Sequence, residues 1–596
     1  MKKHLILALI ALMAGFQIMN AIPARPGRTV YVQPDGTKVL IRQHGDEFGH
    51  WATDLSGRLV VQSPDGYFRP AEGITVDEIR RNASARRAAA RQNRAARRAS
   101  GQHIAAGRKH FLVILVEFSN LEFKKNSEDT HAAFNALLNQ TGYAANGGTG
   151  SARDFYYDNS HGYFEPVFDV YGPVKLDTTY AYYGQNSGGF DIRPEDAVID
   201  GCRKLDGEID FSQYDNDGDG KVDLVFMYYA GKGEADGGNS NTIWPHQWEI
   251  SSAGKSLTLD GTSIDAYACT SELNGSGSMC GIGTACHEFA HAMGLPDFYD
   301  TDYSDNGQAA GLFFFSLMDS GGYNNDGRTP PFFNIEERIM LGWLDESVIR
   351  AFPGAGTYTI PSVDENVAYK TPTDKDGEYF LYECRGSNGW DSELYAHGLV
   401  VYHVDKSNRT VRLNYGSTTA RNLWENWEAY NSINENGSHP CFYIIPAADQ
   451  DNLLYGHFLY AGDYYFDYGY SDKIPFPGSK RVTDYTPVSW NKVEGDIAFK
   501  DISYSGNVVT LSVTIPYDGL EYNTIADAGS YRAGDRFYFA LEEAEDRQPA
   551  SVAWYFDDEP VSADSVTLTA GAHTIEARLV YADGREEVLT LEIEVQ

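Results

Sequence analysis

The segment ACHEFAHAMGLPDFYD, residues 285–300, restricts the possible folds of this chain more than any other feature. Its apolar residues recur at helical spacing, which predicts an amphipathic helix. His287 and His291 lie four residues apart, so a helix places both imidazoles on one face, one turn apart. Two imidazoles in this arrangement can chelate one metal ion, and Glu288 can reach the ion's open coordination position. The spacing therefore favours a metal site over an ordinary polar helix face.

The residues after this helix supply a third ligand. Gly294 tolerates the positive φ of a sharp turn, and Pro296 prevents the helix from continuing. The chain then turns back, and Asp297 can reach the ion with a carboxylate, which is an acceptable zinc ligand. Asp300, or a residue further along, is the alternative. Zinc held by three protein ligands lowers the pKa of a water molecule in the fourth position, and we expect Glu288 to act on that water as general base.

A second feature is FFFSLMDSGGY, residues 313–323. It places Met318 shortly before a glycine pair, and it resembles the methionine turn that lies below the zinc site in metzincin metallopeptidases. A core methionine in an ordinary turn is the plainer alternative. Tyr323 could lie near the cleft and stabilise an oxyanion, although we favour a structural role for it.

Together, HEFAHAMGLPDFYD, FSLMDSGGY and NIEERIMLGWL resemble the M6 peptidase family, the immune inhibitor A-like metalloproteases of bacteria. RDFYYDNSHGYF and GWDSELYAHGLVVYHVD are similar to segments before and after that family's active site. The resemblance covers residues 108–515, and the part before it is similar to the family's pro-region. It implies an α+β, metzincin-like zinc endopeptidase made as a secreted zymogen, with His287 and His291 as ligands and Glu288 as catalytic residue. Metzincins usually have a histidine where this chain has Asp297.

The chain is predicted to contain several units. Its first residues, MKKHLILALIALMAGFQIMNA, combine two lysines, a short apolar run and small residues, which is typical of a secretory signal peptide. No later segment is apolar over enough residues to cross a bilayer. Alternating stretches between turn residues predict a β-rich unit next, and FLVILVEF from Phe111 predicts a buried central strand. We expect a signal peptide (1–21), a β-rich pro-region (22–78), an Arg/Ala-rich linker (79–109), a zinc metallopeptidase domain (110–346), a β-rich accessory domain (347–516) and an immunoglobulin-like β-sandwich (517–596).

The charge distribution is uneven. Residues 1–109 contain 18 Lys and Arg against 8 Asp and Glu, although the whole chain has a net charge of −36. The basic stretch up to Lys109 is predicted to be a solvated linker or helix, or a hinge that proteases cleave between a pro-region and an enzyme. The acidic remainder disfavours nucleic acid as a partner, because phosphates would be repelled. We expect protein or peptide substrates, no membrane span after signal removal, and a monomer.

An acidic loop, DNDGDGKVD, has the ligand spacing of a calcium site. Carboxylates occupy positions one, three, five and nine of an EF-hand-like loop, with a glycine at position six. Phe226 occupies position twelve, where a full EF-hand has a bidentate glutamate, so we expect a truncated, structural calcium loop. A solvated acidic turn is the alternative. The four predicted ligands are Asp215, Asp217, Asp219 and Asp223.

Latency in a zymogen needs a group that blocks the metal. Residues 22–108 contain no cysteine, so a cysteine switch is excluded, and Asp46 and Glu47 are the pro-region carboxylates that could serve. The six cysteines of the chain are sparse and form no C-x-x-C zinc motif. Cys286, although next to His287, is expected to pack in the core.

Three functions fit these patterns. The first is a secreted zinc endopeptidase, and the second is a surface adhesin or binding protein on a degenerate peptidase scaffold. The third is a zinc-dependent amidase or deacetylase. Glu288 favours an enzyme, since a degenerate peptidase has little reason to retain its general base.

Overall fold

The computed structural model describes residues 22–25, 27–63, 65–90, 104–301, 309–415, 417–428, 431–448, 472–514, 524–527, 529–542, 548–582 and 586–596. The predicted signal peptide and residues 91–103 of the predicted linker lie outside the described residues. The chain divides into two compact units, the first ending at Thr514 and the second beginning at Ile515. Among the described helices, none combines the length and the apolar character needed to cross a membrane.

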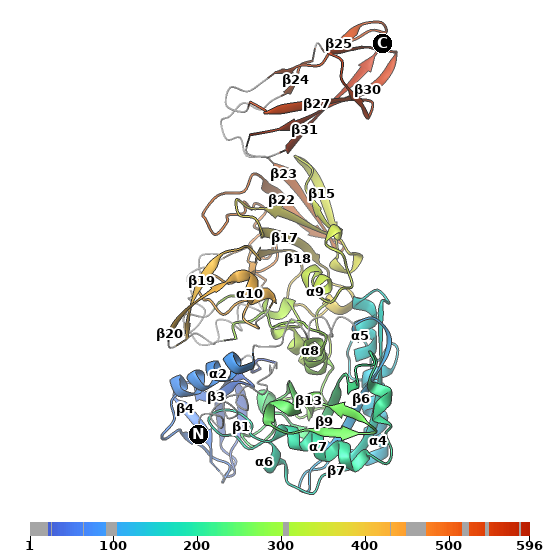
Figure 1. The fold of residues 1–596 in the computed structure, drawn as a ribbon. Coiled ribbons are helices and arrows are strands. Elements are labelled where there is room, and N and C mark those ends of the chain that lie inside the picture. The colour runs from blue at the N-terminus through green and yellow to red at the C-terminus, as the bar shows by residue number, and fades with distance from the viewer. Residues whose placement is uncertain are drawn as a thin grey trace, which may run out of the picture. The chain divides into compact units, whose positions relative to one another are not determined.

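The first unit begins with an antiparallel sheet and a helix (Figure 1). The five strands lie in sequence order, and each pairs with the next. Gly36 and Gly57 adopt positive φ in the turns between them, which glycine does without strain. Helix α2 packs against β3. The bounds are β1 Thr29–Val32, β2 Lys38–Asp46, β3 Gly49–Asp54, β4 Leu59–Gln62, β5 Phe68–Pro70 and α2 Val76–Ala90.

A five-stranded sheet in the order β10-β13-β9-β6-β7 forms the centre of the part of the chain that follows (Figure 1). β7, β6, β9 and β13 are parallel, whereas β10 is antiparallel and lies at the edge. The predicted central strand is β6, which has a neighbour on each side. Helix α8 contacts β13 and β10, so it lies beside the antiparallel edge. The bounds are β6 Gly107–Glu117, β7 Phe164–Lys175, β9 Val225–Lys232, β10 His246–Glu249, β13 Ala266–Leu273 and α8 Gly283–Ala292.

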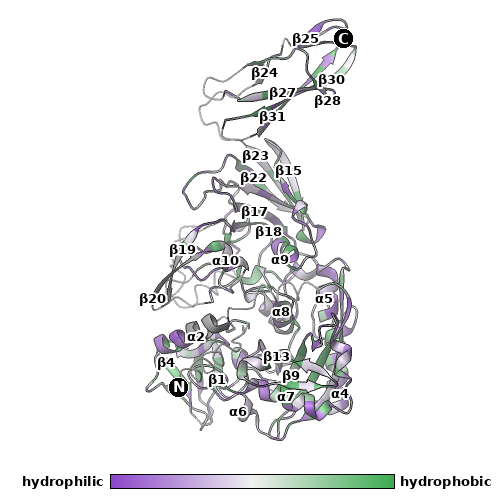
Figure 2. Cartoon of the chain, in the orientation of Figure 1, coloured by the Kyte–Doolittle hydropathy of each residue, from purple (hydrophilic) through white to green (hydrophobic). Residues whose placement is uncertain are grey.

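Strand β6 separates two hydrophobic cores. Phe111 and Val113 belong to one core together with Phe289 of α8, and the rings of Phe111 and Phe289 lie 4.7 Å apart. Leu112 and Ile114 belong to the other core, which α7 covers. Figure 2 shows the hydrophobic residues of this sheet in green around β9. Because each buried apolar side chain stabilises the fold by about 2 kcal/mol, the run at β6 fixes the sheet between its two helical layers.

Side chains cap the N-termini of two helices that pack on this sheet. Ser151 and Asp154 form a reciprocal capping box at the start of α5, and the side chain of Asn126 caps α4. The remaining helices of this part are α4 Ser127–Asn139, α5 Ala152–Asn159, α6 Tyr180–Tyr183, α7 Pro194–Leu205 and α9 Ile335–Met340. A small sheet contains β8 Lys221–Val222, β11 Leu257–Leu259 and β12 Thr262–Ile264. The 3-10 helices are η1 Phe211–Tyr214, η2 Glu234–Asp236, η3 Ile250–Ala253, η4 Phe313–Phe315, η5 Ser320–Gly327, η6 Glu346–Val348, η7 Val363–Glu365 and η8 Gly389–Asp391.

Three further sheets complete the described part of the first unit. One has the order β14-β16-β17-β18-β21, another has the order β15-β23-β22, and β19 pairs with β20. The buried Arg385 on β17 pairs with Asp391 at 2.7 Å and donates to the carbonyl of Phe315 at 3.0 Å, which ties this sheet to the segment before Met318. The bounds are β14 Ile349–Ala351, β15 Gly356–Pro361, β16 Ala368–Pro372, β17 Glu378–Arg385, β18 Gly398–Asp405, β19 Thr410–Tyr415, β20 Ser417–Asn422, α10 Leu423–Glu428, β21 Phe442–Ile445, β22 Ala498–Ser505 and β23 Val508–Thr514.

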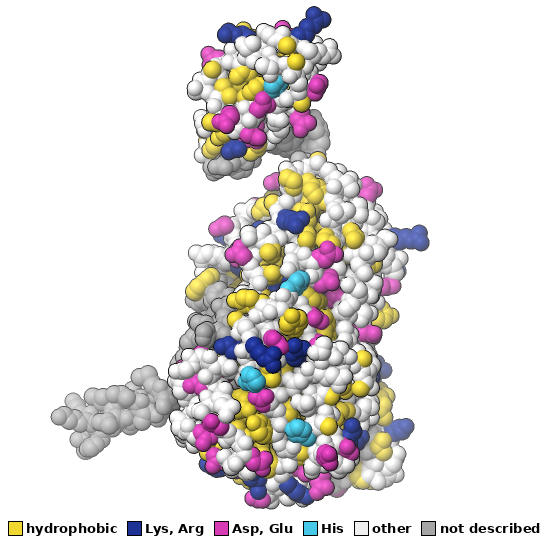
Figure 3. Space-filling model, turned by 90° about the vertical axis from the view of Figure 1, so that its right-hand side faces the viewer, with side chains coloured by type: hydrophobic (Ala, Val, Ile, Leu, Met, Phe, Trp, Pro, Cys, Tyr) yellow, Lys and Arg dark blue, Asp and Glu magenta, His cyan; other side chains and the backbone are white. Residues whose placement is uncertain are grey.

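The second unit consists of strands in its described part. Four of them form the sheet β28-β27-β30-β31, and β24-β26 and β25-β29 form two pairs. Its own core includes Ile575 and Leu579. The bounds are β24 Thr524–Ile525, β25 Arg536–Tyr538, β26 Leu541–Glu542, β27 Ser551–Phe556, β28 Glu559–Val561, β29 Ser565–Thr567, β30 Gly571–Val580 and β31 Glu586–Val595. Acidic and basic side chains are interspersed on the face of the molecule in Figure 3.

Candidate metal centre

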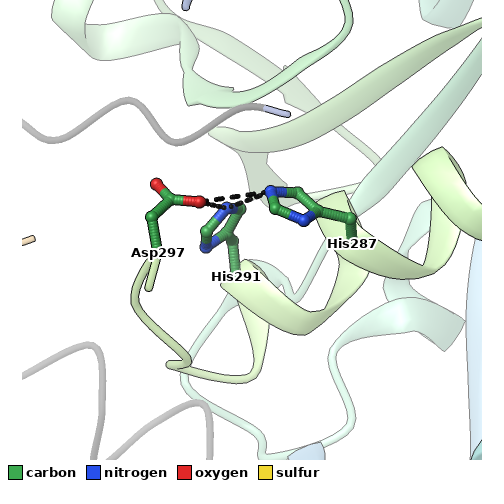
Figure 4. A group of neighbouring side chains, drawn as sticks. All are labelled: His287, His291 and Asp297. Atoms are coloured by element: carbon green, nitrogen blue, oxygen red, sulfur yellow. Dashed lines mark hydrogen bonds and ion pairs between the residues drawn. The ribbon is translucent and has the colours of Figure 1, made fainter. Parts of the chain in front are cut away.

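Helix α8 brings the predicted histidines together. His287 and His291 are both buried, and their Nε2 atoms lie 2.9 Å apart (Figure 4). The helix ends at Ala292, and Gly294 adopts a φ of +99°, as the sequence predicted for a sharp turn. After this turn the chain places Asp297 against the two rings. Its Oδ1 lies 3.3 Å from Nε2 of His287 and 3.2 Å from Nε2 of His291.

The tautomers of the two histidines follow from their other ring nitrogens. Nδ1 of His287 lies 2.7 Å from the carbonyl oxygen of Leu317, and Nδ1 of His291 lies 2.8 Å from that of Leu295. A carbonyl oxygen only accepts, so each Nδ1 carries the proton and each Nε2 is left with a lone pair. Two Nε2 lone pairs and one carboxylate oxygen of Asp297 therefore face one another in a buried space. Such a group repels itself unless a cation lies between its members, so these residues fit a metal ion.

The charges of the site agree with this arrangement. Burial raises the pKa of Asp297, but the charges and hydrogen bonds of His291 and His287 outweigh it and hold that pKa well below its usual range. Burial lowers the pKa of His287, and the bond to Asp297 and the charge of Glu288 raise it overall. For His291, burial dominates and lowers the pKa. Asp297 is thus an anion at any ordinary pH, as a metal ligand must be.

Asp297 is held by a residue that sequence reasoning missed. Asn431 accepts a hydrogen bond from the backbone N–H of Asp297 at 2.6 Å and donates to its Oδ2 at 2.5 Å. Outer residues of this kind orient metal ligands. Asp300, the alternative ligand, instead accepts from the backbone N–H of Ala309 at 2.8 Å and lies outside the group. No spacing signal in the sequence connects Asn431 to a ligand 134 positions earlier.

The turn around Met318 bonds to His287 and to the segment that carries Asp297. Met318 is fully buried, and the residue before it, Leu317, accepts the proton of His287. The carbonyl of Met318 accepts from the backbone N–H of Phe298 at 2.8 Å, next to Asp297. One turn therefore fixes both a histidine and the segment that carries the carboxylate.

Glu288 faces an N-terminal segment of the same chain. Its Oε1 accepts a hydrogen bond at 2.9 Å from the backbone N–H of Ile22, a residue that is fully buried. Burial raises the pKa of Glu288 to about 8. The carbonyl of Ile22 accepts from Nε1 of Trp244 at 3.2 Å, and the carbonyl of Pro23 accepts from the hydroxyl of Tyr323 at 2.8 Å. We call residues 22–25 the N-terminal strap.

The strap is also anchored at its far end. The backbone N–H of Arg25 donates to the carbonyl of Ala235 at 3.1 Å. The guanidinium of Arg25 pairs with Asp236 at 3.0 Å and with Asp326 at 2.6 Å. The main chain of the N-terminal strap therefore lies against Glu288 and makes hydrogen bonds to residues far along the chain, among them Tyr323 and Ala235.

The pro-region carboxylates that we expected to block the metal, Asp46 and Glu47, are not among the three residues whose ligand atoms converge at α8. Asp46 accepts from the backbone N–H groups of Phe48 and Gly49 in its own turn, and Glu47 is buried. The segment that reaches Glu288 is the N-terminal strap, which sequence reasoning missed. All six cysteines fall within the described residues, and they are buried and form no disulfide; Cys286 packs in the core as expected.

The acidic loop keeps three of its four predicted ligands together. The carboxylates of Asp215, Asp217 and Asp219 converge, whereas Asp223 accepts from the side chain of Asn216 at 2.6 Å. Burial raises the pKa of Asp223 to about 6. Backbone N–H groups of the loop donate to the converging carboxylates, for example Gly218 to Asp215 at 2.8 Å.

Comparison with known families identifies this part of the chain. Residues 101–334 match the family model for the catalytic domain of immune inhibitor A peptidase M6. Residues 101–334 form a domain that matches the M6 peptidase family, and we call this range the peptidase part. The resemblance predicted from the zinc helix and the methionine turn is thereby confirmed. The matched range of this M6 domain includes the three converging ligands and Glu288, and it excludes both the N-terminal strap and Asn431.

Curated relatives match only part of this chain. Immune inhibitor A of Bacillus thuringiensis subsp. alesti is 24% identical over 351 residues, which is 46% of this chain and 49% of that protein. The pre-pro-metalloprotease PrtV of Vibrio cholerae serotype O1 (strain M66-2) is 25% identical over 255 residues, 36% of this chain and 27% of PrtV. The match thus spans about half and about a quarter of these relatives. Among solved structures, OgpA from Akkermansia muciniphila covers 82% of this chain and 93% of its own at 10% identity, with a TM-score of 0.21, which is too low to support an argument about the fold.

Proposed function

We propose that this M6 protein is a secreted zinc endopeptidase, with a metzincin-like catalytic domain, that is made as a zymogen. The observation that carries the proposal is the main chain of the N-terminal strap against Glu288. Ile22 donates its backbone N–H to the glutamate, and the carbonyl of the next residue, Pro23, accepts from Tyr323. A site that holds the main-chain groups of a polypeptide in this way suits the cleavage of peptide bonds within a chain better than the hydrolysis of a small amide.

His287, His291 and Asp297 would hold the zinc ion. When bound, zinc supplies a Lewis acid that polarises the scissile carbonyl and acidifies water. Glu288 is buried beside these ligands, where it would take a proton from the attacking water and return it to the leaving amine. Tyr323 would donate its hydroxyl to the substrate carbonyl, as it now does to Pro23.

Latency would come from the N-terminal strap. In the zymogen it lies against the general base and uses the hydroxyl of Tyr323, so a substrate cannot use either group. The basic linker after α2 offers a place for proteolytic release of the N-terminal sheet. The printed name of the relative PrtV, a pre-pro-metalloprotease, agrees with synthesis as a precursor. Secretion rests on the signal-like sequence of residues 1–21.

Two parts of the proposal concern the remaining regions. The loop at Asp215, Asp217 and Asp219 would bind structural calcium. Asp223 would not bind the ion directly but would hold the side chain of Asn216 in the same loop. Loss of thermal stabilisation by calcium chloride in a D215N/D217N variant would support this. The strands of residues 517–596 would form an immunoglobulin-like unit for binding protein surfaces.

The test combines metal content with proteolysis. The chain from Ile22 onward is nicked with trypsin, and zinc and casein cleavage are measured for the wild type and for E288Q. We expect about one catalytic zinc in both proteins, and proteolysis only in the wild type. If the nicked, zinc-loaded wild type cleaves no protein, the enzyme proposal fails and the binding-protein alternative replaces it.

A further inference from the structure

A second group of metal-ligating side chains lies where the N-terminal sheet meets the peptidase part. His50 belongs to β3, Asp191 lies just before α7, and Glu234 begins η2. One ligand atom from each comes within 4.8 Å of the others. The three residues are 3%, 7% and 5% exposed, so they are more than nine-tenths buried. None of them belongs to the centre on α8.

The lone pairs of this group point inward. Nδ1 of His50 lies 3.0 Å from the carbonyl oxygen of Asp46, so it carries the proton of the neutral ring, and Nε2 faces Glu234 Oε2 at 3.3 Å. Oδ1 of Asp191 is buried and makes no hydrogen bond within the described part of the chain, while its Oδ2 accepts from the backbone N–H of Trp244 at 2.7 Å. This repeats the arrangement at α8, where buried lone pairs also converge.

The charges of the group do not balance without a cation. Two carboxylates face one imidazole, and burial of unpaired charge is costly. One divalent cation between them neutralises both carboxylates and leaves the imidazole neutral.

We propose that His50, Asp191 and Glu234 form a second metal site, which binds a divalent cation of the zinc type and joins the N-terminal sheet to the peptidase part. One imidazole and two carboxylates suit zinc, whereas calcium takes oxygen ligands. A cavity of about 220 Å³ is lined by His50 and Glu234 and also by Gln43 and Asn186, which leaves room for a water ligand and for entry of the ion.

Trp244 connects this site to the catalytic one. Its ring stacks on His50, with centroids 4.3 Å apart and planes inclined by 15°, and its backbone holds Asp191. Its indole N–H holds the carbonyl of Ile22, the residue that donates to Glu288. The metal ion at the second site therefore fixes Trp244, which holds the N-terminal strap. Removal of this ion weakens the attachment of the strap in the zymogen, a consequence that rests on the proposed function.

The test removes the catalytic ligands so that only the second site remains. The chain from Ile22 onward is prepared as H287A/H291A and as the same variant with H50Q added. H44Q on the H287A/H291A background is the matched control, because His44 lies in the same small sheet and bonds Thr53. Each protein is dialysed against zinc chloride and then against metal-free buffer, and its zinc is measured by elemental analysis. We expect about one zinc in H287A/H291A and in the H44Q control, and about none with H50Q.

These measurements test the second metal site independently of the proposed enzyme activity, because none of them depends on proteolysis. A folded H287A/H291A protein without zinc overturns the second site and leaves a proton-bridged group at His50. Zinc that persists after H50Q overturns it as well, since another site then binds the ion. If the H50Q protein does not fold, an anomalous-scattering map of the wild type at the zinc edge decides, and a map without a peak between His50 and Glu234 refutes the proposal. Gel filtration of trypsin-nicked wild type and H50Q then shows whether the N-terminal fragment dissociates earlier in the variant.

Discussion

Replacing Arg25 by alanine should raise the proteolytic activity of the proposed zymogen before its linker is cleaved. The guanidinium joins the end of the N-terminal strap to the peptidase part through Asp236 at 3.0 Å and Asp326 at 2.6 Å. The side chain of Arg25 is 29% exposed and that of Asp326 is 42% exposed, so the pair with Asp326 is partly screened by solvent. We assign the two charge-assisted bonds about 2 kcal/mol together, most of it from the better-buried Asp236.

The lost binding energy of the N-terminal strap determines how much the activity of the uncleaved chain increases. If the strap must leave Glu288 before a substrate enters, losing about 2 kcal/mol raises the open fraction about 30-fold. The assay is the initial rate of cleavage of a quenched fluorescent peptide by the zinc-loaded zymogen, with electrophoresis to show that the linker is still intact. Fully nicked R25A should match nicked wild type, since Arg25 contacts none of the proposed zinc ligands.

A matched variant distinguishes the strap from a general effect of charge. Arg58 pairs with Asp54 inside the N-terminal sheet and is 71% exposed, so R58A removes the same charge without touching the strap. We expect R58A to remain as latent as the wild type. If R25A leaks no more than R58A does, the N-terminal strap does not maintain latency, and the contact between Ile22 and Glu288 has no inhibitory role.

Three further predictions concern the centre and its support. N431A should weaken zinc binding about 10- to 100-fold in a chelator competition, because Asp297 loses both of its bonds to the amide; an unchanged affinity would remove Asn431 from the site. Y323F should lower kcat of the nicked enzyme about 100-fold with zinc content unchanged, and a change in KM alone would make the tyrosine a binding residue only. Burial raises the pKa of Glu337 from 4.5 to about 7, so its stabilising contribution is complete below pH 4.5 and is lost as the pH rises through 7. Relative to E337Q, the wild type should therefore lose about 3 kcal/mol of unfolding free energy between pH 5 and pH 8 in urea titrations, whereas parallel curves would contradict the shift.

Much of the catalytic helix follows from the sequence, because its signals are local. The spacing of His287 and His291 places both rings on one face of any helix, and Gly294 with its positive φ turns the chain back. The apolar run at β6 likewise predicts a central strand, since an uninterrupted run of this kind must be buried on both faces. These features depend on residues within about one or two helical turns, so a pattern along the chain is sufficient to predict them.

The partners of the centre were decided by the tertiary structure. Asn431 meets Asp297 across 134 positions, and Ile22 meets Glu288 across 266. Contacts of this range arise when separate sheets pack, and no periodicity in the sequence encodes which loops then become neighbours. The choice of Asp297 over Asp300 was decided in the same way, because two carboxylates three residues apart look equal until the turn after Gly294 directs one of them to the histidines.

The group of His50, Asp191 and Glu234 shows most clearly what the sequence alone does not predict. Nothing near His50 distinguishes it as a ligand in the sequence, and its possible partners, Asp191 and Glu234, are separated from it by more than one hundred residues. Only the packing of β3 against the loops of the peptidase part brings one imidazole and two carboxylates into a shared buried space. The sequence by itself determined the helix that carries His287 and His291, its turn and the central strand, since these need only neighbouring residues. The tertiary structure decided which distant residues contact the centre, because burial and convergence of charge are properties of the packed chain.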